Sequence, residues 1–249
     1  MKTPCLIALA LLLAVPASAQ VMGTGTGPRV GQQFGGRDPY MDQQRCYNRH
    51  HPPAERAEAC KRLLESGNIW PQDVADAYRL AGNYDAALAV LAQTLTAHPT
   101  YAKALEERAV VYATMGKYDL AMADADAAVA ATPNDYRAFN ARCWVHAATN
   151  KDLDTAQNDC AQALMLQHDA ADALDTRGFL DFRRGDVKAA IADYDAAIDG
   201  DPTVASSRYM RGLAKLRTGD TDGSAADIDR AKDIDPYIGD EFATYGVKP

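Results

Sequence analysis

Cysteine and histidine are the residues of this sequence that could form a covalent bond or bind a metal. Cys46, His50, His51 and Cys60 lie close together, and thiolate and imidazole groups are the usual ligands of zinc. Their spacing matches no standard zinc pattern. Of the five cysteines, Cys5 belongs to the expected signal peptide described below, and the four that remain are an even number, which favours disulfides in an exported chain. We therefore expect no metal site. We expect Cys46, Cys60, Cys143 and Cys160 to form two disulfides, and these four cysteines can pair in three ways.

The sequence contains none of the motifs that place a nucleophile beside a base. It has no G-x-S-x-G, no H-E-x-x-H and no phosphate-binding P-loop. The stretch from Thr218 to Asp229 resembles a calcium loop but lacks the first carboxylate and the final Glu. The formal net charge of −8 opposes binding to nucleic-acid phosphates. The sequence therefore predicts no catalytic residue, no cofactor and no nucleic-acid partner.

The elements that position these side chains follow from an internal repeat. Pro99, Pro133, Pro202 and Pro236 are spaced 34, 69 and 34 residues apart, and 69 is two such periods plus one residue. Apolar residues between these prolines recur at helical spacing, so each period is expected to form two helices. A residue that ends the first helix also recurs: Gly82, Gly116, Asn150, Gly185 and Gly219.

Segments such as Arg177-Gly178 … Asp201-Pro202 resemble the tetratricopeptide repeat (TPR) family. The resemblance covers residues 68–236 as five repeats: 68–101, 102–135, 136–170, 171–204 and approximately 205–238. It implies an all-α α-solenoid, a right-handed superhelix of five helical hairpins whose concave face binds peptides or protein segments. Residues 39–67 are expected to form an N-terminal helical half-repeat, and residues 237–249 a C-terminal capping helix and tail, because stacked repeats need covered ends. The expected helices outside the array are Met41–Asn48, Pro53–Ser66 and Ile238–Tyr245.

One arginine and one aspartate recur at fixed positions of four repeats. A catalytic role would need a single special pair, so four copies favour structural ion pairs between packed helices. The arginines of the first helices and the aspartates of the second helices are Arg108, Arg142, Arg177, Arg211, Asp124, Asp159, Asp193 and Asp227.

The repeat also favours one pairing of the cysteines. Cys143 takes the position held by the small residues Ala109, Gly178 and Gly212 in other repeats, and Cys160 lies on the helix that faces it. The two backbones of one hairpin approach closely at such a position, which suits a Cys143–Cys160 disulfide. Cys46 and Cys60 are then left to join the two N-terminal helices.

The stripe of the first helices that lines the concave groove in the TPR family gives the candidate binding residues. Large aromatic and Arg side chains gather on it in repeats 3 to 5, which is typical of interface anchors. We expect Trp144, Phe179 and Tyr209 to be exposed anchors, whereas Phe182 and Leu216 could equally fill the space between repeats. The candidate groove residues are Arg137, Asn140, Trp144, Asp175, Phe179, Phe182, Arg183, Tyr209, Leu213 and Arg217.

The N-terminus indicates export. A short positive region, an apolar run and the triplet Ala17-Ser18-Ala19 predict a signal peptide of residues 1–19. The Gly-rich residues 20–38 that follow are expected to form a flexible leader. No later segment approaches the ~20 apolar residues that a membrane-spanning helix needs. We expect a mature protein that is periplasmic, with secretion as the alternative.

Together these features predict a periplasmic scaffold or adaptor that binds an extended segment of an envelope protein in its groove. One alternative is a protein that binds a small molecule or cell-wall fragment in the same groove. The other is a hydrolase with an unrecognised site. The sequence does not predict an oligomeric state.

Overall fold

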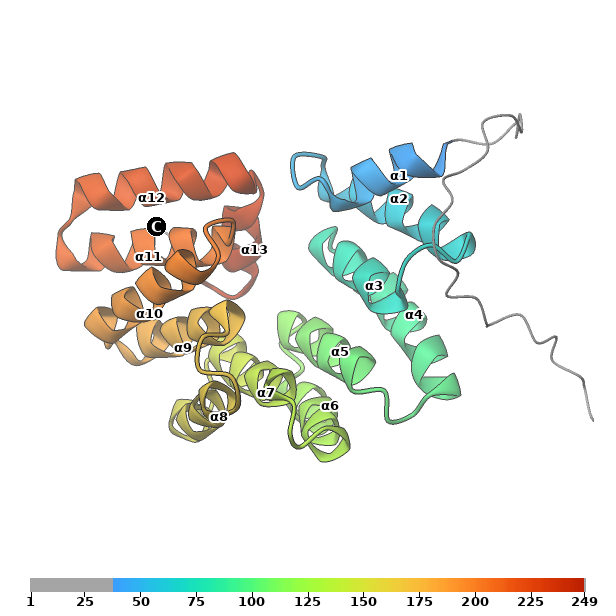
Figure 1. Ribbon diagram of the computed structural model, residues 1–249, viewed down its shortest axis with the longest axis horizontal. Coiled ribbons are helices and arrows are strands. Elements are labelled where there is room, and N and C mark those ends of the chain that lie inside the picture. The colour runs from blue at the N-terminus through green and yellow to red at the C-terminus, as the bar shows by residue number, and fades with distance from the viewer. Residues whose placement is uncertain (1–37, 249) are drawn as a thin grey trace, which may run out of the picture. The chain divides into compact units, whose positions relative to one another are not determined.

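The computed structural model describes residues 38–248, which form thirteen helices and no strand (Figure 1). The prediction of an all-α solenoid built from helical hairpins is confirmed. The expected signal peptide and all but the last residue of the expected leader lie outside the described residues. The helices are α1 Pro39–Tyr47, α2 Pro53–Glu65, α3 Pro71–Leu80, α4 Tyr84–Ala97, α5 Ala102–Thr114, α6 Tyr118–Ala131, α7 Tyr136–Thr149, α8 Leu153–Leu166, α9 Ala171–Arg184, α10 Val187–Gly200, α11 Ala205–Thr218, α12 Thr221–Ile234 and α13 Ile238–Thr244.

The turn inside each hairpin depends on one residue with positive φ. Gly185 and Gly219 adopt φ of +85° and +86°, a conformation that costs glycine little because it has no Cβ. In repeats 1, 4 and 5 the next residue then caps the second helix, as when the Asp186 carboxylate accepts a hydrogen bond from the Ala189 backbone N–H at 3.2 Å. In repeat 3 the inserted residue lies in this turn, where Asn150 and Asp152 both have positive φ.

Within each hairpin, the two helices approach most closely where the first helix carries a small residue. A Cβ added to Gly178 would lie 2.7 Å from Cε1 of Tyr194, and a Cβ on Gly212 would lie 2.8 Å from Cγ1 of Ile228. At the same position of repeat 3 the structure joins Cys143 to Cys160, whose Cα atoms are 5.5 Å apart. The Cys46–Cys60 bridge joins α1 to α2 in the same way, with a Cα separation of 4.9 Å.

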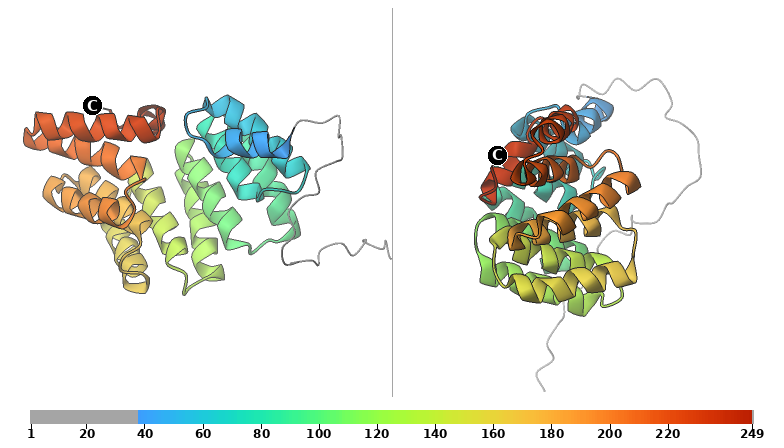
Figure 2. Two further views of the ribbon diagram at one scale, coloured as in Figure 1. Left: turned by 45° about the horizontal axis from the view of Figure 1, so that its top comes forward. Right: turned by 90° about the vertical axis from the view of Figure 1, so that its left-hand side faces the viewer.

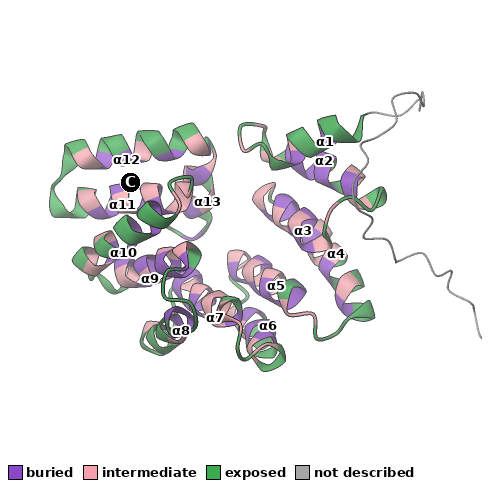
Figure 3. Ribbon diagram, viewed as in Figure 1, coloured by how far each residue is buried: buried purple, intermediate pink, exposed green. Residues whose placement is uncertain are grey.

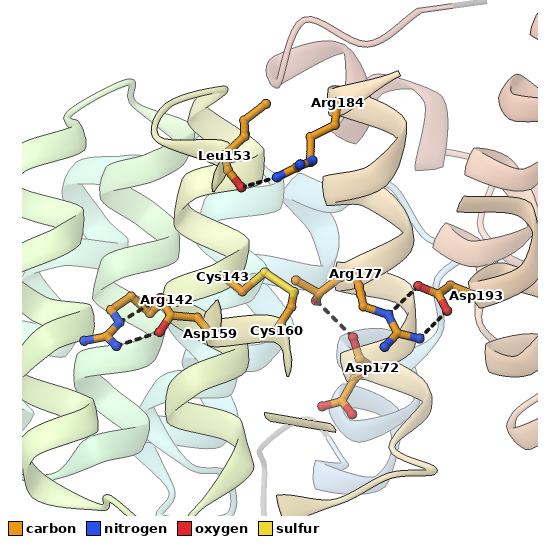
Figure 4. Close-up of a disulfide and its surroundings, with 10 residues drawn as sticks. Arg142, Cys143, Leu153, Asp159, Cys160, Asp172, Arg177, Arg184 and Asp193 are labelled. Carbon is orange, nitrogen blue, oxygen red and sulfur yellow. Dashed lines mark hydrogen bonds and ion pairs between the residues drawn. A yellow bond between two sulfur atoms is a disulfide. The ribbon is translucent and has the colours of Figure 1, made fainter. Parts of the chain in front are cut away.

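The recurring Arg and Asp residues meet inside their own hairpins, next to these small-residue contacts (Figure 4). Nε and Nη2 of Arg177 donate hydrogen bonds to the two carboxylate oxygens of Asp193 at 2.7 and 2.6 Å. Arg142 and Arg211 each bind a second aspartate on the preceding repeat, whereas Ala161 stands at that position for Arg177. The remaining pairs of the same kind are Arg108–Asp124, Arg142–Asp159 and Arg211–Asp227.

The C-terminal helix α13 lies on the inner side of the array. Figures 1 and 2 show it next to α11 and on the side where the α1–α2 pair faces the last hairpin. The two ends of the described chain are joined there by an ion pair between Arg49 and Asp235 at 3.1 Å, and Nε2 of His50 contacts the Asp233 carbonyl oxygen at 3.0 Å. Residues 38–248 contain no helix with the length and apolar character required to cross a membrane.

Candidate functional site: the concave face

The first helices of the five repeats, α3, α5, α7, α9 and α11, form the concave face. Its aromatic residues on α7, α9 and α11 are not free. Phe179 and Tyr209 are 1% and 2% exposed, so the expectation that these two side chains are exposed is wrong, whereas Trp144 is half-buried. The helix α13 buries Ile238 and Phe242, and Figure 3 colours part of it as buried. Phe182 is also buried, whereas Leu216 is 42% exposed.

Two aromatic side chains of the C-terminal segment cover the concave face. The ring of Phe242 stacks on Tyr209 with centroids 5.6 Å apart and meets Phe179 edge-on at 5.7 Å. The ring of Tyr245 meets Trp144 edge-on at 5.4 Å. Phe242 and Tyr245 are 2% and 6% exposed, so nearly all of both side chains lies inside the contact.

Polar groups from three further positions bind the same segment. Nη1 of Arg79 on α3 donates to the Tyr245 hydroxyl at 3.0 Å, and its Nη2 donates to the Glu241 carboxylate at 3.1 Å. Thr114 on α5 lies 3.4 Å from the same hydroxyl, measured between the two oxygens. Arg183 on α9 donates from Nη2 to the backbone carbonyl of Tyr245. Residues 238–247 therefore contact the first helix of every repeat.

The arginines predicted for the groove have different partners. Besides Tyr245, Arg183 binds the Ala147 carbonyl at 3.1 Å and lies over the Phe179 ring. Arg217 donates to the Phe182 carbonyl at 3.1 Å and lies over the Phe182 ring, so it links α11 to α9. Arg137 is exposed at the start of α7 and pairs with Asp135 at 3.4 Å. Only Arg183 of these three contacts the C-terminal segment.

The other predicted residues line the same face. Asp175 accepts a hydrogen bond from the Ser207 hydroxyl at 2.5 Å, and Leu213 is 3% exposed. The side-chain oxygen Oδ1 of Asn140 and the indole Nε1 of Trp144 are buried and make no hydrogen bond with the described residues. Both residues belong to α7 and are four positions apart, so these two polar atoms share one side of that helix.

Burial raises the pKa of two carboxyl groups and of the Tyr245 hydroxyl on this face. Burial, reinforced by the nearby carboxylate of Asp76, raises the pKa of Glu107 to about 8. Burial also raises the pKa of Asp175 to about 6, although the hydrogen bond from Ser207 opposes the shift. Burial raises the pKa of the Tyr245 hydroxyl to about 12, so this group stays a neutral hydrogen-bonding partner.

A cavity of about 450 Å³ lies beside the C-terminal segment, between it and the helices α2 and α3. Its charged lining includes Arg49 and Arg79, which are paired with Asp235 and Glu241. Arg56 also lines it and is 6% exposed, yet its guanidinium makes only one hydrogen bond, from Nε to the Cys46 carbonyl at 3.2 Å, and no ion pair within the described residues. Burial and the neighbouring Arg49 lower the pKa of Arg56.

Five of the residues that make this contact were not predicted from the sequence. Arg79 and Thr114 occupy repeats whose first helices carry no aromatic stripe, and Glu241, Phe242 and Tyr245 belong to a segment predicted only to cap the last repeat. One signal was present in the sequence: Phe242 and Tyr245 are three positions apart in the helix expected for Ile238–Tyr245, a spacing that places two side chains on one side of a helix.

Comparison with known proteins agrees with this architecture. The tetratricopeptide repeat pattern matches residues 74–136 and 177–237, and no curated protein matches the chain. The crystal structure of TTC0263, a thermophilic TPR protein of Thermus thermophilus, superposes with a TM-score of 0.60 at 21% identity, covering 71% of this chain and 95% of that one. The crystal structure of PilW, a type IV pilus biogenesis factor, gives 0.54 at 16% identity, covering 71% and 84%. At these identities the likeness concerns the fold, and together with the repeat pattern it shows that the chain belongs to the tetratricopeptide repeat family.

Proposed function

We propose that this TPR protein is an exported adaptor of the cell envelope whose concave face holds a short segment of a partner protein. The observation that carries the proposal is the binding of residues 238–247 to that face. This segment is held by ring contacts and by hydrogen bonds to a side chain and to the backbone, which are the means by which grooves recognise peptides. A surface that binds one such segment has the shape and chemistry to bind another.

Two features support export to the envelope. The N-terminal residues 1–19 have the composition of a signal peptide, and the structure joins all four cysteines of the described chain into two disulfides. Cell fractionation and N-terminal sequencing test this part of the proposal. A mature chain that begins at Gln20 in the periplasmic fraction is the expected result, and a cytoplasmic chain that keeps Met1 would contradict it.

Site-specific photo-crosslinking tests the binding surface. A photoreactive residue replaces Arg137, which is exposed on the rim of the concave face, or Met165, which is 72% exposed on α8. In an envelope extract of the producing cells, the substitution at Arg137 should crosslink a defined protein that the substitution at Met165 does not. Crosslinks confined to Met165 would place the partner on another surface and refute the proposal.

A further inference from the structure

The C-terminal segment is bound as a separate ligand would be. Its aromatic pair and the Tyr245 hydroxyl and carbonyl contact five helices that belong to five different repeats. A helix that only capped the array would cover the last hairpin, α11–α12, and would have no need for bonds to Arg79 on the first repeat. A single short connection, Asp235-Pro236-Tyr237, joins the segment to the last helix of the array, α12.

We infer that residues 238–247 are an intramolecular ligand, and that the partner's segment displaces them by presenting the same chemistry with one added charge. The inference rests on the proposed function, since it names the partner of the same face. The segment bound here reads Glu-Phe-x-x-Tyr from Glu241 to Tyr245. The partner segment is therefore a short helix with two aromatic residues three positions apart, a carboxylate before the first of them, and a second carboxylate that reaches Arg56.

The added carboxylate follows from what the intramolecular ligand leaves unused. Arg56 is buried and makes no hydrogen bond to an acidic group, although the carboxylates of Asp76, Asp235 and Glu241 act on it from a longer distance. It lines the 450 Å³ cavity together with Thr244. Thr244 is exposed and lies on the side of α13 that faces this cavity. An acidic residue at the position of Thr244 would line the same cavity as Arg56, and the contact inferred between them is a charge-assisted hydrogen bond, which is stronger than a neutral one. A partner with that residue gains a contact that the chain's own segment does not offer.

The contacts between the α1–α2 pair and the last hairpin are few and polar, whereas the segment itself is held by the buried side chains of Ile238, Phe242, Tyr245 and Val247, which a partner segment has to replace. The α1–α2 pair meets the last hairpin through Arg49–Asp235 and His50–Asp233, and the side chain of Arg49 is 42% exposed. Because the side chain of Asp235 is only 6% exposed, breaking this pair costs more than breaking a surface pair, but it disturbs no contact within a hairpin. The hairpins themselves are held by the separate ion pairs and disulfides described above, which the segment does not touch.

The test uses the full-length mature chain and a synthetic peptide of residues 236–249. The chain has two tryptophans, so a Trp70→Phe background leaves Trp144, which contacts Tyr245, as the fluorescent reporter of the face. In that background, Phe242→Ala/Tyr245→Ala removes both aromatic contacts of the intramolecular ligand. This variant should bind the peptide at least tenfold more tightly than the chain with Phe242 and Tyr245 intact. The matched control, Tyr40→Ala/Tyr47→Ala, removes two exposed aromatics of α1 and should leave the affinity unchanged.

A second peptide tests the added charge. The peptide with Thr244→Glu should bind about tenfold more tightly than the parent peptide, the gain expected of one charge-assisted hydrogen bond at ~1.4 kcal/mol per tenfold. The gain should disappear when the chain carries Arg56→Gln. A peptide with both aromatics replaced by alanine should not bind. Equal affinities of the two peptides, or a gain that persists in the Arg56→Gln chain, would overturn the assignment of Arg56.

Hydrogen exchange on the unsubstituted chain provides a measurement that does not depend on how the variants fold. Amides of 238–247 should exchange at least tenfold faster than those of α11, and excess Thr244→Glu peptide should speed them further. Exchange as slow as that of α11, or equal peptide affinity with and without Phe242 and Tyr245, would show that the segment is a permanent part of the fold. Failure of the proposed function is separate, because it appears as a missing partner in the crosslinking experiment while peptide binding persists.

Discussion

Removing Arg177 from the Arg177–Asp193 ion pair should lower the free energy of unfolding more than removing Asp193. Asp193 is 8% exposed and accepts both of its side-chain hydrogen bonds from Arg177, whose own side chain is 38% exposed. Arg177→Ala leaves a buried carboxylate without a partner, and we expect a loss of about 2–3 kcal/mol, below the roughly 3–5 kcal/mol of a fully buried pair. Asp193→Ala leaves an arginine that water can reach, so the loss should be about 1 kcal/mol.

Among the four recurring pairs, this one is suited to a double-mutant cycle because Arg177 has no second aspartate. Urea denaturation of the two single variants, the double variant and the unsubstituted chain should give a coupling of about 1–2 kcal/mol. The control cycle is Arg230/Asp233 on α12, where the charged atoms are 3.7 Å apart and both side chains are more than half exposed. Its coupling should be below about 0.5 kcal/mol. Additive losses at Arg177 and Asp193, or equal couplings in the two cycles, would refute the reasoning from burial.

Three further predictions concern other parts of the framework. Reducing the Cys143–Cys160 disulfide should lower the free energy of unfolding by ~3 kcal/mol in the chain-entropy model, and thiol counting before reduction should find no free cysteine if the mature chain is oxidised. Gly178→Ala should cost ~1–3 kcal/mol in urea denaturation, because the added Cβ would lie 2.7 Å from Tyr194; a loss below about 0.5 kcal/mol, the size of a surface change, would contradict this packing. The raised pKa of Glu107 favours its protonated form in the folded state, so the contribution of this group to stability is full below the ordinary pKa of 4.5 and is lost as the pH rises through about 8. Glu107→Gln should therefore flatten the fall in melting temperature between about pH 5 and 9. An unchanged dependence of the melting temperature on pH would contradict the shift.

The hairpin framework was predictable from the sequence because its causes are local and repeated. Gly185 ends a helix through its own φ, and Asp186 caps the next helix through a bond three residues away. The pairing of Cys143 with Cys160 was predictable for the same reason, since the position between two helices of one hairpin is set by a turn of fixed length. Each of these features needs only neighbouring residues, so the period of the sequence was enough to show them.

The covering of the concave face was not predictable in this way. The aromatic stripe of Trp144, Phe179 and Tyr209 has the same pattern whether it binds a partner or the chain's own end. Which of the two occurs depends on where the segment after Pro236 turns, and that is decided by contacts of Tyr245 with Arg79 and Thr114, which lie 166 and 131 residues earlier in the chain. Periodicity does not encode a contact between residues so far apart.

The residues that hold each hairpin together nevertheless differ from those that bind the segment in how regularly they recur along the repeats. The framework position of Arg177 carries arginine in four repeats, because each hairpin must solve the same packing problem. At the position of Arg183 the five repeats carry Leu80, Thr114, Ala148, Arg183 and Arg217. Thr114 and Arg183 hold Tyr245, whereas Arg217 links α11 to α9. A single short segment that crosses several repeats presents a different atom to each, a hydroxyl to one and a carbonyl to another. The residues that bind it therefore do not have to repeat with the period, whereas the framework arginines do, because each of them serves its own hairpin.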